Sequence, residues 1–251
     1  MESKINRYSK QLILINSFFI LAWLIISVFP FIWTFWGSFK VKADFFSRAD
    51  WMFAVTGVNT LIETGDTSTV KAYVESWTEG EFWKATMNTI IITVSVVTIS
   101  LFLGTLGAYA LSRSTYKYTF WILIAALIFR AMPHITLVSG YLFPFFQLNV
   151  WGILPTTIIV LVAINQPFTL WLLYSFFKTV PKELDESALI DGCTYFQAFR
   201  FVIMPVMWPG VVTAGLFSMM LAYNDFTVTS LLLNQQNYTM VPKINALSLI
   251  H

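Results

Sequence analysis

The feature that most constrains this chain is a series of long segments without a charged residue. Four such runs of 29, 28, 47 and 24 residues lie between Lys10 and Lys40, Lys84 and Arg113, Arg130 and Lys178, and Arg200 and Asp225. A helix of about 20 largely apolar residues crosses the hydrocarbon core of a bilayer. Only 11% of the residues are charged, whereas soluble domains carry about a quarter. The sequence therefore predicts an integral membrane protein.

The run of 47 uncharged residues is too long for one helix and fits two crossings joined by a short turn at 149–155. We therefore expect an all-α, polytopic transmembrane helix bundle. Its five predicted spans lie near residues 12–36, 85–111, 119–146, 155–177 and 207–233. Pro133 falls inside the third span, where we expect a kinked helix whose freed backbone groups are satisfied by neighbouring helices. The first apolar run is longer than a signal-peptide core, so it is interpreted as an uncleaved span.

Basic residues near the span ends predict the orientation. They lie before the first span, between the second and third, and between the fourth and fifth, at Lys4, Arg7, Lys10, Arg113, Lys117, Lys178, Lys182 and Arg200. The positive-inside rule assigns these three segments, and the N-terminus, to the cytoplasm. Loop 37–84 carries five basic and seven acidic residues, but long loops translocate largely regardless of charge. We expect that loop to be extracytoplasmic.

Several functional classes are disfavoured by the residue inventory. One cysteine excludes an internal disulfide and a Cys-x-x-Cys metal site, and two histidines are too few for a histidine-built zinc site. The sequence has no phosphate-binding loop of the G-x-x-x-x-G-K-[ST] type and no visible nucleophile–base pair. The net charge of +2 is small, and its basic residues are dispersed, which argues against nucleic-acid binding. We expect a non-catalytic chain that binds no metal or cofactor.

The segment between the fourth and fifth spans, 178–206, predicts two short helices. Pro181 suits a first helical turn, and Glu183, Asp185 and Glu186 place negative charge at the positive end of the helix dipole. Gly192 is a typical helix stop because glycine adopts the left-handed conformation without a steric penalty. The first helix is thus predicted to end at a glycine elbow.

A second helix is predicted to begin at Thr194, since Gln197 three residues later completes a capping box. Both helices have a predicted apolar side, formed by Leu184, Ala188 and Leu189 in the first and by Phe196, Phe199 and Ile203 in the second. Asp185 and Glu186 are expected to lie outside the apolar side of the first helix.

This arrangement resembles the EAA loop of permeases in binding-protein-dependent ABC importers. The family pattern is E-A-A, three residues, G, nine residues, I, one residue and L-P, and this chain matches its spacing with Glu186-Ser187-Ala188, Gly192, Val202, Met204 and Pro205. Ser187, Val202 and Met204 are conservative departures from the pattern, and Cys193 stands where the family commonly has alanine.

The resemblance covers about 35–240 and points to the carbohydrate branch, in particular the smaller of the two maltose-type permeases. It rests on the segments Ser38–Phe46, Asn88-Thr89, Ala108–Arg113 and Tyr223–Phe226. It implies a type I ABC importer permease in a bacterial or archaeal cytoplasmic membrane, carrying a sugar, oligosaccharide or polyol. It also implies a second permease subunit, two ATPase subunits that bind ATP and Mg²⁺, and an extracytoplasmic solute-binding protein.

In such a complex the loop docks on an ATPase subunit. The resemblance implies a coupling site of Glu183, Leu184, Glu186, Ala188, Leu189, Asp191, Gly192, Phe196 and Pro205. The apolar side chains are expected to supply contact area and the acids to fix the register against basic groups. A short cytoplasmic loop is also often amphipathic and acidic without a partner, and only the spacing match argues against that simpler interpretation.

Polar and ionisable groups inside predicted spans are candidates for the substrate pathway. These are Arg130, His134, Asn224 and Asp225. Arg130 alternatively snorkels to an interface or makes a structural contact, and Asn224 and Asp225 alternatively hold a neighbouring helix.

Two alternative functions stay open. One is a permease of the same class for polyamines or another small solute, and the other is a secondary transporter driven by an ion gradient. The second class often contains internal repeats, which this sequence does not display, and has no need of an EAA loop.

Five spans from a cytoplasmic N-terminus place His251 outside the membrane, whereas the resemblance implies a sixth span. The polar stretch Asn234–Lys243 is predicted to be the turn before it. The eight residues that follow span about 12 Å as a helix, too little for a core about 30 Å thick. We expect the source reading frame to continue into a further apolar helix.

Overall fold

A computed structural model describes residues 2–38 and 68–250 of the chain. It consists of two compact units, Met1–Gly80 and Glu81–His251. Most of the predicted loop 37–84, together with the family-like segment that follows Ser38, lies outside the described residues.

The first unit contains helices α1, Glu2–Gly37, and α4, Ser68–Thr78. In α1 the stretch Leu12–Phe35 is long and apolar enough to cross a bilayer, and its side chains are almost entirely exposed within the unit. Pro30 lies inside this helix without ending it, and Thr34 Oγ1 donates a hydrogen bond to the Pro30 carbonyl at 2.7 Å. Exposed apolar side chains along the whole of such a stretch are what a lipid-facing span requires.

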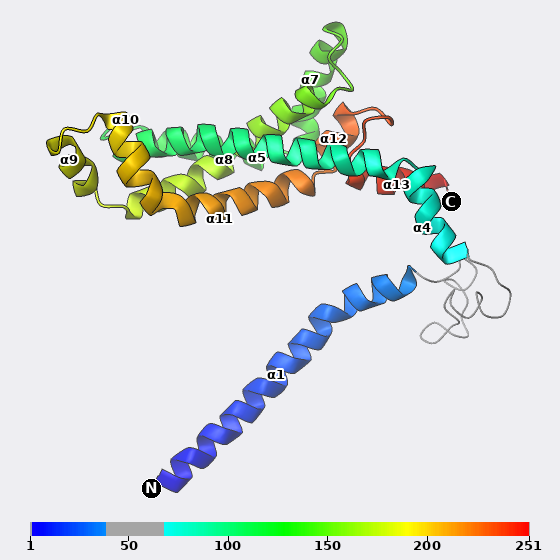
Figure 1. The fold of residues 1–251 in the computed structure, drawn as a ribbon, viewed down its shortest axis with the longest axis horizontal. Coiled ribbons are helices and arrows are strands. Elements are labelled where there is room, and N and C mark those ends of the chain that lie inside the picture. Colours follow the sequence, from blue (N-terminus) through cyan, green and yellow to red (C-terminus); the bar gives the residue numbers. More distant parts are fainter. Residues whose placement is uncertain (1, 39–67, 251) are drawn as a thin grey trace. The chain divides into compact units, whose positions relative to one another are not determined.

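The second unit is a bundle built around three long helices that run alongside one another, α5, α8 and α11 (Figure 1). Its elements are α5 Phe82–Arg113, α6 Thr119–Ala131, α7 His134–Gln147, α8 Leu154–Thr179, α9 Glu183–Ile190, α10 Tyr195–Gln197, the π-helix η1 Ala198–Ile203, α11 Met204–Tyr223, α12 Thr227–Leu232 and α13 Met240–Ile250. The described part of the chain contains no β-strand among these elements. The prediction of an all-α membrane bundle is therefore confirmed.

Glycines let the three long helices approach one another closely. A Cβ atom at Gly104 of α5 would lie 3.2 Å from side-chain atoms of α8, and one at Gly215 of α11 would lie 3.1 Å from Leu101 of α5. The tightest contact is at Gly210 of α11, where an added Cβ would lie only 2.8 Å from Cγ of Phe176. Small residues at helix crossings are typical of membrane bundles, where association depends on close packing.

The third predicted span is broken in the structure. Helices α6 and α7 meet at an angle of 85°, on either side of Met132 and Pro133. Proline lacks an amide hydrogen and disfavours helical conformation in the residue before it, and Met132 has an extended ψ of 143°. The sequence predicted a kinked single helix here, whereas the structure has two separate helices that form either one broken span or a re-entrant loop.

The fifth span also differs from its predicted bounds. Helix α11 ends at Tyr223 rather than near 233, and a separate short helix, α12, follows. Asp225 lies between the two helices and stabilises the start of the second, because its Oδ1 accepts hydrogen bonds from the amides of Val228 at 2.9 Å and Thr229 at 3.1 Å. Part of the polar stretch predicted as a turn belongs to α13, which begins at Met240.

Four helices in the described ranges are long and apolar enough to cross a membrane, and the number rises to five if α6 and α7 count as one span. The turn between α7 and α8 lies where the sequence places it, with Asn149 and Gly152 at positive φ values of 54° and 82°. This turn is tied to the end of α12, since the Gly152 amide donates to the Leu232 carbonyl at 3.0 Å and Trp151 Nε1 donates to the Leu231 carbonyl at 3.0 Å.

Candidate functional site

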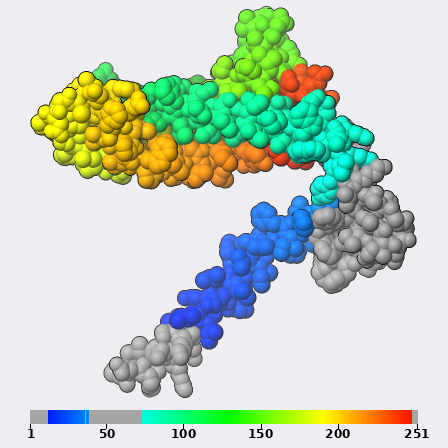
Figure 2. Space-filling model, viewed as in Figure 1, coloured from blue at the N-terminus to red at the C-terminus, as the bar shows by residue number. Residues whose placement is uncertain are grey.

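The segment between α8 and α11 forms one end of the second unit, with α9 and α10 at its tip (Figure 2). Gly192 joins the two helices in a left-handed conformation, with φ of +87°. The turn is closed by backbone hydrogen bonds from the Gly192 amide to the Leu189 carbonyl at 3.1 Å and from the Cys193 amide to the Ala188 carbonyl at 3.0 Å. Nothing lies within 4 Å of a Cβ added at Gly192, so glycine is needed there for its backbone conformation and not for space.

Thr194 begins the second helix with the predicted capping box. Its Oγ1 accepts from the Gln197 amide at 3.3 Å, and its own amide donates to Gln197 Oε1 at 2.8 Å. From there the helix runs through the π-turn η1 into α11, so that Tyr195–Tyr223 is one helical rod. We call α9 the first arm of the loop and α10 with η1 the second arm. The second arm is thus continuous with a long apolar helix.

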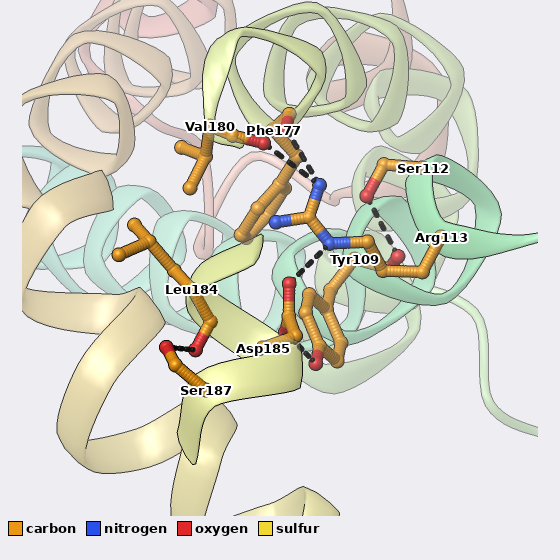
Figure 3. Close-up of polar contacts among 8 residues, drawn as sticks. All are labelled: Tyr109, Ser112, Arg113, Phe177, Val180, Leu184, Asp185 and Ser187. Carbon is orange, nitrogen blue, oxygen red and sulfur yellow. Dashed lines mark hydrogen bonds and ion pairs between the residues drawn. The ribbon is translucent and has the colours of Figure 1, made fainter. Parts of the chain in front are cut away.

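The first arm is joined to the bundle differently, through the side chain of Arg113 at the end of α5 (Figure 3). Its Nε lies 2.8 Å from Oδ2 of Asp185 on α9. Its Nη1 donates to the carbonyls of Phe177 at 3.2 Å and Val180 at 3.0 Å, at the end of α8. One guanidinium group therefore contacts the ends of α5 and α8 and the body of α9.

Asp185 is held from a second side by Tyr109, one turn before Arg113 on α5 (Figure 3). The Tyr109 hydroxyl donates to Asp185 Oδ1 at 2.6 Å, and its ring centroid lies 4.8 Å from that of Phe199 and 5.7 Å from that of Phe177. Asp185 is only 9% exposed. The prediction that Asp185 lies outside the apolar side of its helix is wrong, because an ion pair and a hydroxyl inside the protein satisfy its charge.

The coupling-site residues fall into two groups in the structure. Ala188 is 5% exposed and packs within the chain, and Leu184 and Leu189 are half-buried, so the expected contact area for a partner does not come mainly from these three. Exposed residues, which we call the elbow surface, are Glu183, Glu186, Ile190, Asp191, Tyr195 and Phe196. Pro205 is also exposed, in the first turn of α11.

Large apolar side chains at the elbow surface escaped the sequence prediction. Ile190 is 85% exposed and Tyr195 is 73% exposed, and both flank Gly192. Glu183, Glu186 and Ile190 follow the spacing i, i+3, i+7 that places residues on one face of a helix. That spacing was the signal available from the sequence, and it identifies the outward face of α9 as two carboxylates followed by an isoleucine.

Arg130 lies near the end of α6 and faces α8. Its Nη1 donates to the Ile164 carbonyl and to Asn165 Oδ1, each at 3.3 Å, and its guanidinium lies 5.3 Å from the centroid of the Phe168 ring. A cavity of about 440 Å³ opens beside it between α6, α7 and α8, and Tyr141 and Pro167 are among its lining residues. Arg130 therefore has both a structural contact and a place at a cavity wall.

The other predicted pathway residues have separate surroundings. His134 is the first residue of α7. Asn224 donates through Nδ2 to the Met220 carbonyl of its own helix at 2.9 Å and is exposed, and Asp225 caps α12 as described above. The hydrogen bonds of Arg130, Asn224 and Asp225 thus go to three different helices. No cluster of three or more metal-ligating side chains occurs among residues 2–38 and 68–250.

Long apolar helices, glycine-mediated packing and a helical hairpin between two of the helices define a polytopic α-helical membrane protein. Residues 97–249 match the family described as binding-protein-dependent transport system inner membrane component. The chain belongs to this family.

Two similar proteins illustrate its relatives. The chain is 29% identical to the diacetylchitobiose uptake system permease protein NgcG of Streptomyces coelicolor over 82% of its own length, and it spans 65% of that protein. It is 31% identical to the trehalose/maltose transport system permease protein MalG of Thermococcus litoralis, over 93% of its own length and 79% of the relative.

The fold is also similar to that of a solved structure. A chain from the crystal structure of a bacterial ABC transporter involved in the import of the acidic polysaccharide alginate superposes with a TM-score of 0.67. The match covers 92% of this chain and 77% of that chain, at 19% sequence identity. At this identity the similarity concerns the fold.

Proposed function

We propose that the chain is a membrane-spanning permease subunit of an ATP-driven importer for a sugar, oligosaccharide or polyol. It forms half of a translocation pathway and couples to a separate ATPase through residues 178–206. The observation that carries this proposal is the rigid elbow at Gly192, which presents exposed apolar and acidic side chains at the end of the unit.

The elbow surface has the composition of a docking surface. Ile190, Tyr195 and Phe196 are large apolar residues exposed within seven positions of one another, and clustered apolar side chains at a surface mark an interaction site. Glu183 and Glu186 add negative charge on α9, the helix that also carries Ile190. A cleft with an apolar floor and basic groups at its rim complements this surface in shape and charge.

The construction of the loop suits the transmission of movement. The capping box at Thr194 and the closed turn at Gly192 satisfy the helix ends locally, so the elbow holds its shape without a partner. Its second arm continues as one helical rod to Tyr223. Displacement of the docked elbow by a closing ATPase therefore displaces α11 as a rigid body.

The proposed complex contains a second permease subunit, two ATPase subunits and an extracytoplasmic solute-binding protein. ATP and Mg²⁺ are bound by the ATPase subunits, since the chain's sequence has no phosphate-binding loop. In the bacterial or archaeal cytoplasmic membrane, the N-terminus and the elbow face the cytoplasm, as the basic residues near the span ends indicate.

Sugar cargo is supported by the similar proteins, whose names specify uptake of diacetylchitobiose and of trehalose or maltose. Within the chain, Arg130 at the 440 Å³ cavity is the strongest candidate for the pathway wall, and His134, Asn224 and Asp225 are weaker ones because two of them already serve helix ends.

The test is transport by the full complex in proteoliposomes. Diacetylchitobiose, trehalose, maltose, sorbitol and spermidine are offered with ATP inside, in the presence and absence of vanadate. We expect vanadate-sensitive uptake of a sugar or the polyol. Uptake of spermidine alone would assign the chain to a polyamine system, and uptake driven by an imposed ion gradient without ATP would assign it to secondary transporters.

A further inference from the structure

We propose that the ion pair between Arg113 and Asp185 is a mechanical joint that carries the movement of the coupling loop to α5 and α8. This inference rests on the proposed function, because it concerns how docking at the elbow reaches the membrane helices. In it Arg113 and Asp185 are positioning residues that act through the helices they connect and touch neither ATPase nor cargo.

The two arms of the loop differ in their covalent connection to the bundle. The second arm is continuous with α11, whereas the first is interrupted between α8 and α9. Val180 at the interruption is extended, with ψ of 119°, and Pro181 follows it without an amide hydrogen. Movement of α9 therefore passes poorly along the chain into α8, because the helical hydrogen-bond ladder stops there.

Arg113 bridges this interruption from the opposite direction. It contacts Asp185 on one side of the break and the Phe177 and Val180 carbonyls on the other side. It is also the last residue of α5, a helix that is distant from α9 in sequence. Through one planar, charged group the three elements are held in a fixed geometry, a role to which the guanidinium fork of arginine is suited.

The surroundings of the pair make it a rigid connection. The pair is largely screened from solvent, and Asp185 receives a further hydrogen bond from Tyr109. Tyr109 in turn packs against Phe177 and Phe199, within an apolar cluster under the loop that includes Leu173. Water screens a buried charge pair poorly, and removal of one partner leaves the other charge buried without compensation.

The central test uses Asp185→Asn in the full complex, because this substitution keeps the size of the side chain and an acceptor for Tyr109 while it removes the charge. We expect ATPase subunits to co-purify and ATP to be hydrolysed as in the wild type, while uptake per ATP hydrolysed falls roughly ten-fold, within the usual range of coupling between sites. The matched control is Glu81→Gln, which removes the half-exposed Glu81–Lys84 pair at the other end of α5 and is expected to leave that ratio unchanged.

A second readout is independent of the cargo. In a Cys193→Ala background, a cysteine replaces Thr98, an exposed residue in the middle of α5. In the wild-type loop its rate of thiol labelling is expected to change between nucleotide-free and ATP-bound complexes, and in Asp185→Asn this change is expected to disappear. If the wild-type complex shows neither this change nor vanadate-sensitive uptake, the proposed function fails. If the change persists unaltered in Asp185→Asn, only the joint fails.

Two further results decide the role of the pair. The double variant Arg113→Gln/Asp185→Asn is expected to lose no more uptake per ATP than Arg113→Gln alone, since both residues serve one joint, whereas multiplied losses would show independent roles.

Loss of ATPase subunits from purified Asp185→Asn would place Asp185 in docking and overturn the proposal. If that variant does not accumulate in the membrane, the double variant removes the same ion pair without leaving a buried charge uncompensated, and unchanged uptake per ATP in it would contradict the joint.

Discussion

Asp185 and Glu186 are adjacent on α9, yet the carboxylate of Asp185 is held inside the protein by Arg113 and Tyr109 while that of Glu186 is exposed. Neighbouring residues of a helix project about 100° apart around its axis, so α9 presents one acid to the bundle and the other to the outside. Two chemically similar side chains thus have separate tasks, one in the internal connection of the loop and one in its outer surface.

Reversal of the charge at Glu186 tests whether the elbow surface docks on an ATPase subunit. Glu186→Lys is expected to weaken association with the ATPase subunits roughly ten-fold, which corresponds to about 1.4 kcal/mol, because a cation would then face the basic rim that we propose for the docking cleft. The measurement is the amount of ATPase retained on the purified permease, at low and at high salt. Higher salt should narrow the difference from the wild type by screening.

Glu79→Lys provides the matched control for this substitution, since it makes the same charge change at an exposed residue outside the coupling loop 178–206. Equal retention of ATPase by Glu186→Lys and Glu79→Lys would show that the outward face of α9 is not the docking face.

A bulky residue at Gly192 tests the elbow. The φ of +87° at this position lies in a region that a β-branched residue rarely adopts, and an L-residue in the left-handed conformation costs about 1–2 kcal/mol. Gly192→Val is expected to disturb the turn and to abolish ATP-dependent uptake, with loss of ATPase from the purified complex. Uptake measurements and co-purification check this outcome.

The control for Gly192→Val is Gly140→Val, because a Cβ at either glycine has nothing within 4 Å but Gly140 lies in helix α7 with an ordinary φ. If both variants lose transport to the same extent, the effect does not come from the left-handed conformation.

Local sequence signals predicted the elements of the loop well. Gly192 and the pair Thr194 and Gln197 act through hydrogen bonds and conformations within a few residues, so their roles are readable without the fold. Uncharged runs likewise predicted the long apolar helices, because the thickness of a bilayer sets a minimum length that few other structures need.

The burial of Asp185 was beyond such signals. Tyr109, its hydrogen-bond partner, is 76 positions away in the chain, and nothing near Asp185 in the sequence indicates that its carboxylate has partners inside the protein. The break at Pro133 was only half predicted. Proline marks the position of a kink, but it does not set the angle of 85° between the two helices or bring α7 against α12, a helix about 80 positions further along the chain.

Helix packing in the bundle is tested at Gly210. An added Cβ there would lie 2.8 Å from Cγ and 3.1 Å from Cβ of Phe176. The Phe176 Cβ is fixed by the backbone, and its Cγ moves only if the whole ring changes its χ1 rotamer. Gly210→Ala is expected to lower the stability of the detergent-solubilised complex by about 1–3 kcal/mol through overpacking, seen as a lower midpoint of thermal aggregation. Gly107→Ala should have a smaller effect, since its nearest contact is the flexible end of Leu170 at 3.1 Å. The reverse order would contradict the packing of α11 against α8.

The orientation of the bundle in the membrane decides whether the elbow lies on the cytoplasmic side, where an ATPase subunit can bind it. In a Cys193→Ala background, single cysteines replace Thr78, at the end of α4, and Thr115, between α5 and α6, both exposed positions. Because the basic residues predict a cytoplasmic α5–α6 turn, an impermeant thiol reagent added to intact spheroplasts is expected to label Thr78→Cys and not Thr115→Cys. After permeabilisation both should react, which controls for local accessibility. When α6 and α7 together form one broken span, two crossings separate Thr115 from the elbow, and the two then share a side of the membrane. Labelling of Thr115→Cys alone in intact cells would therefore place the elbow outside, away from ATP, and would remove the basis for coupling to an ATPase.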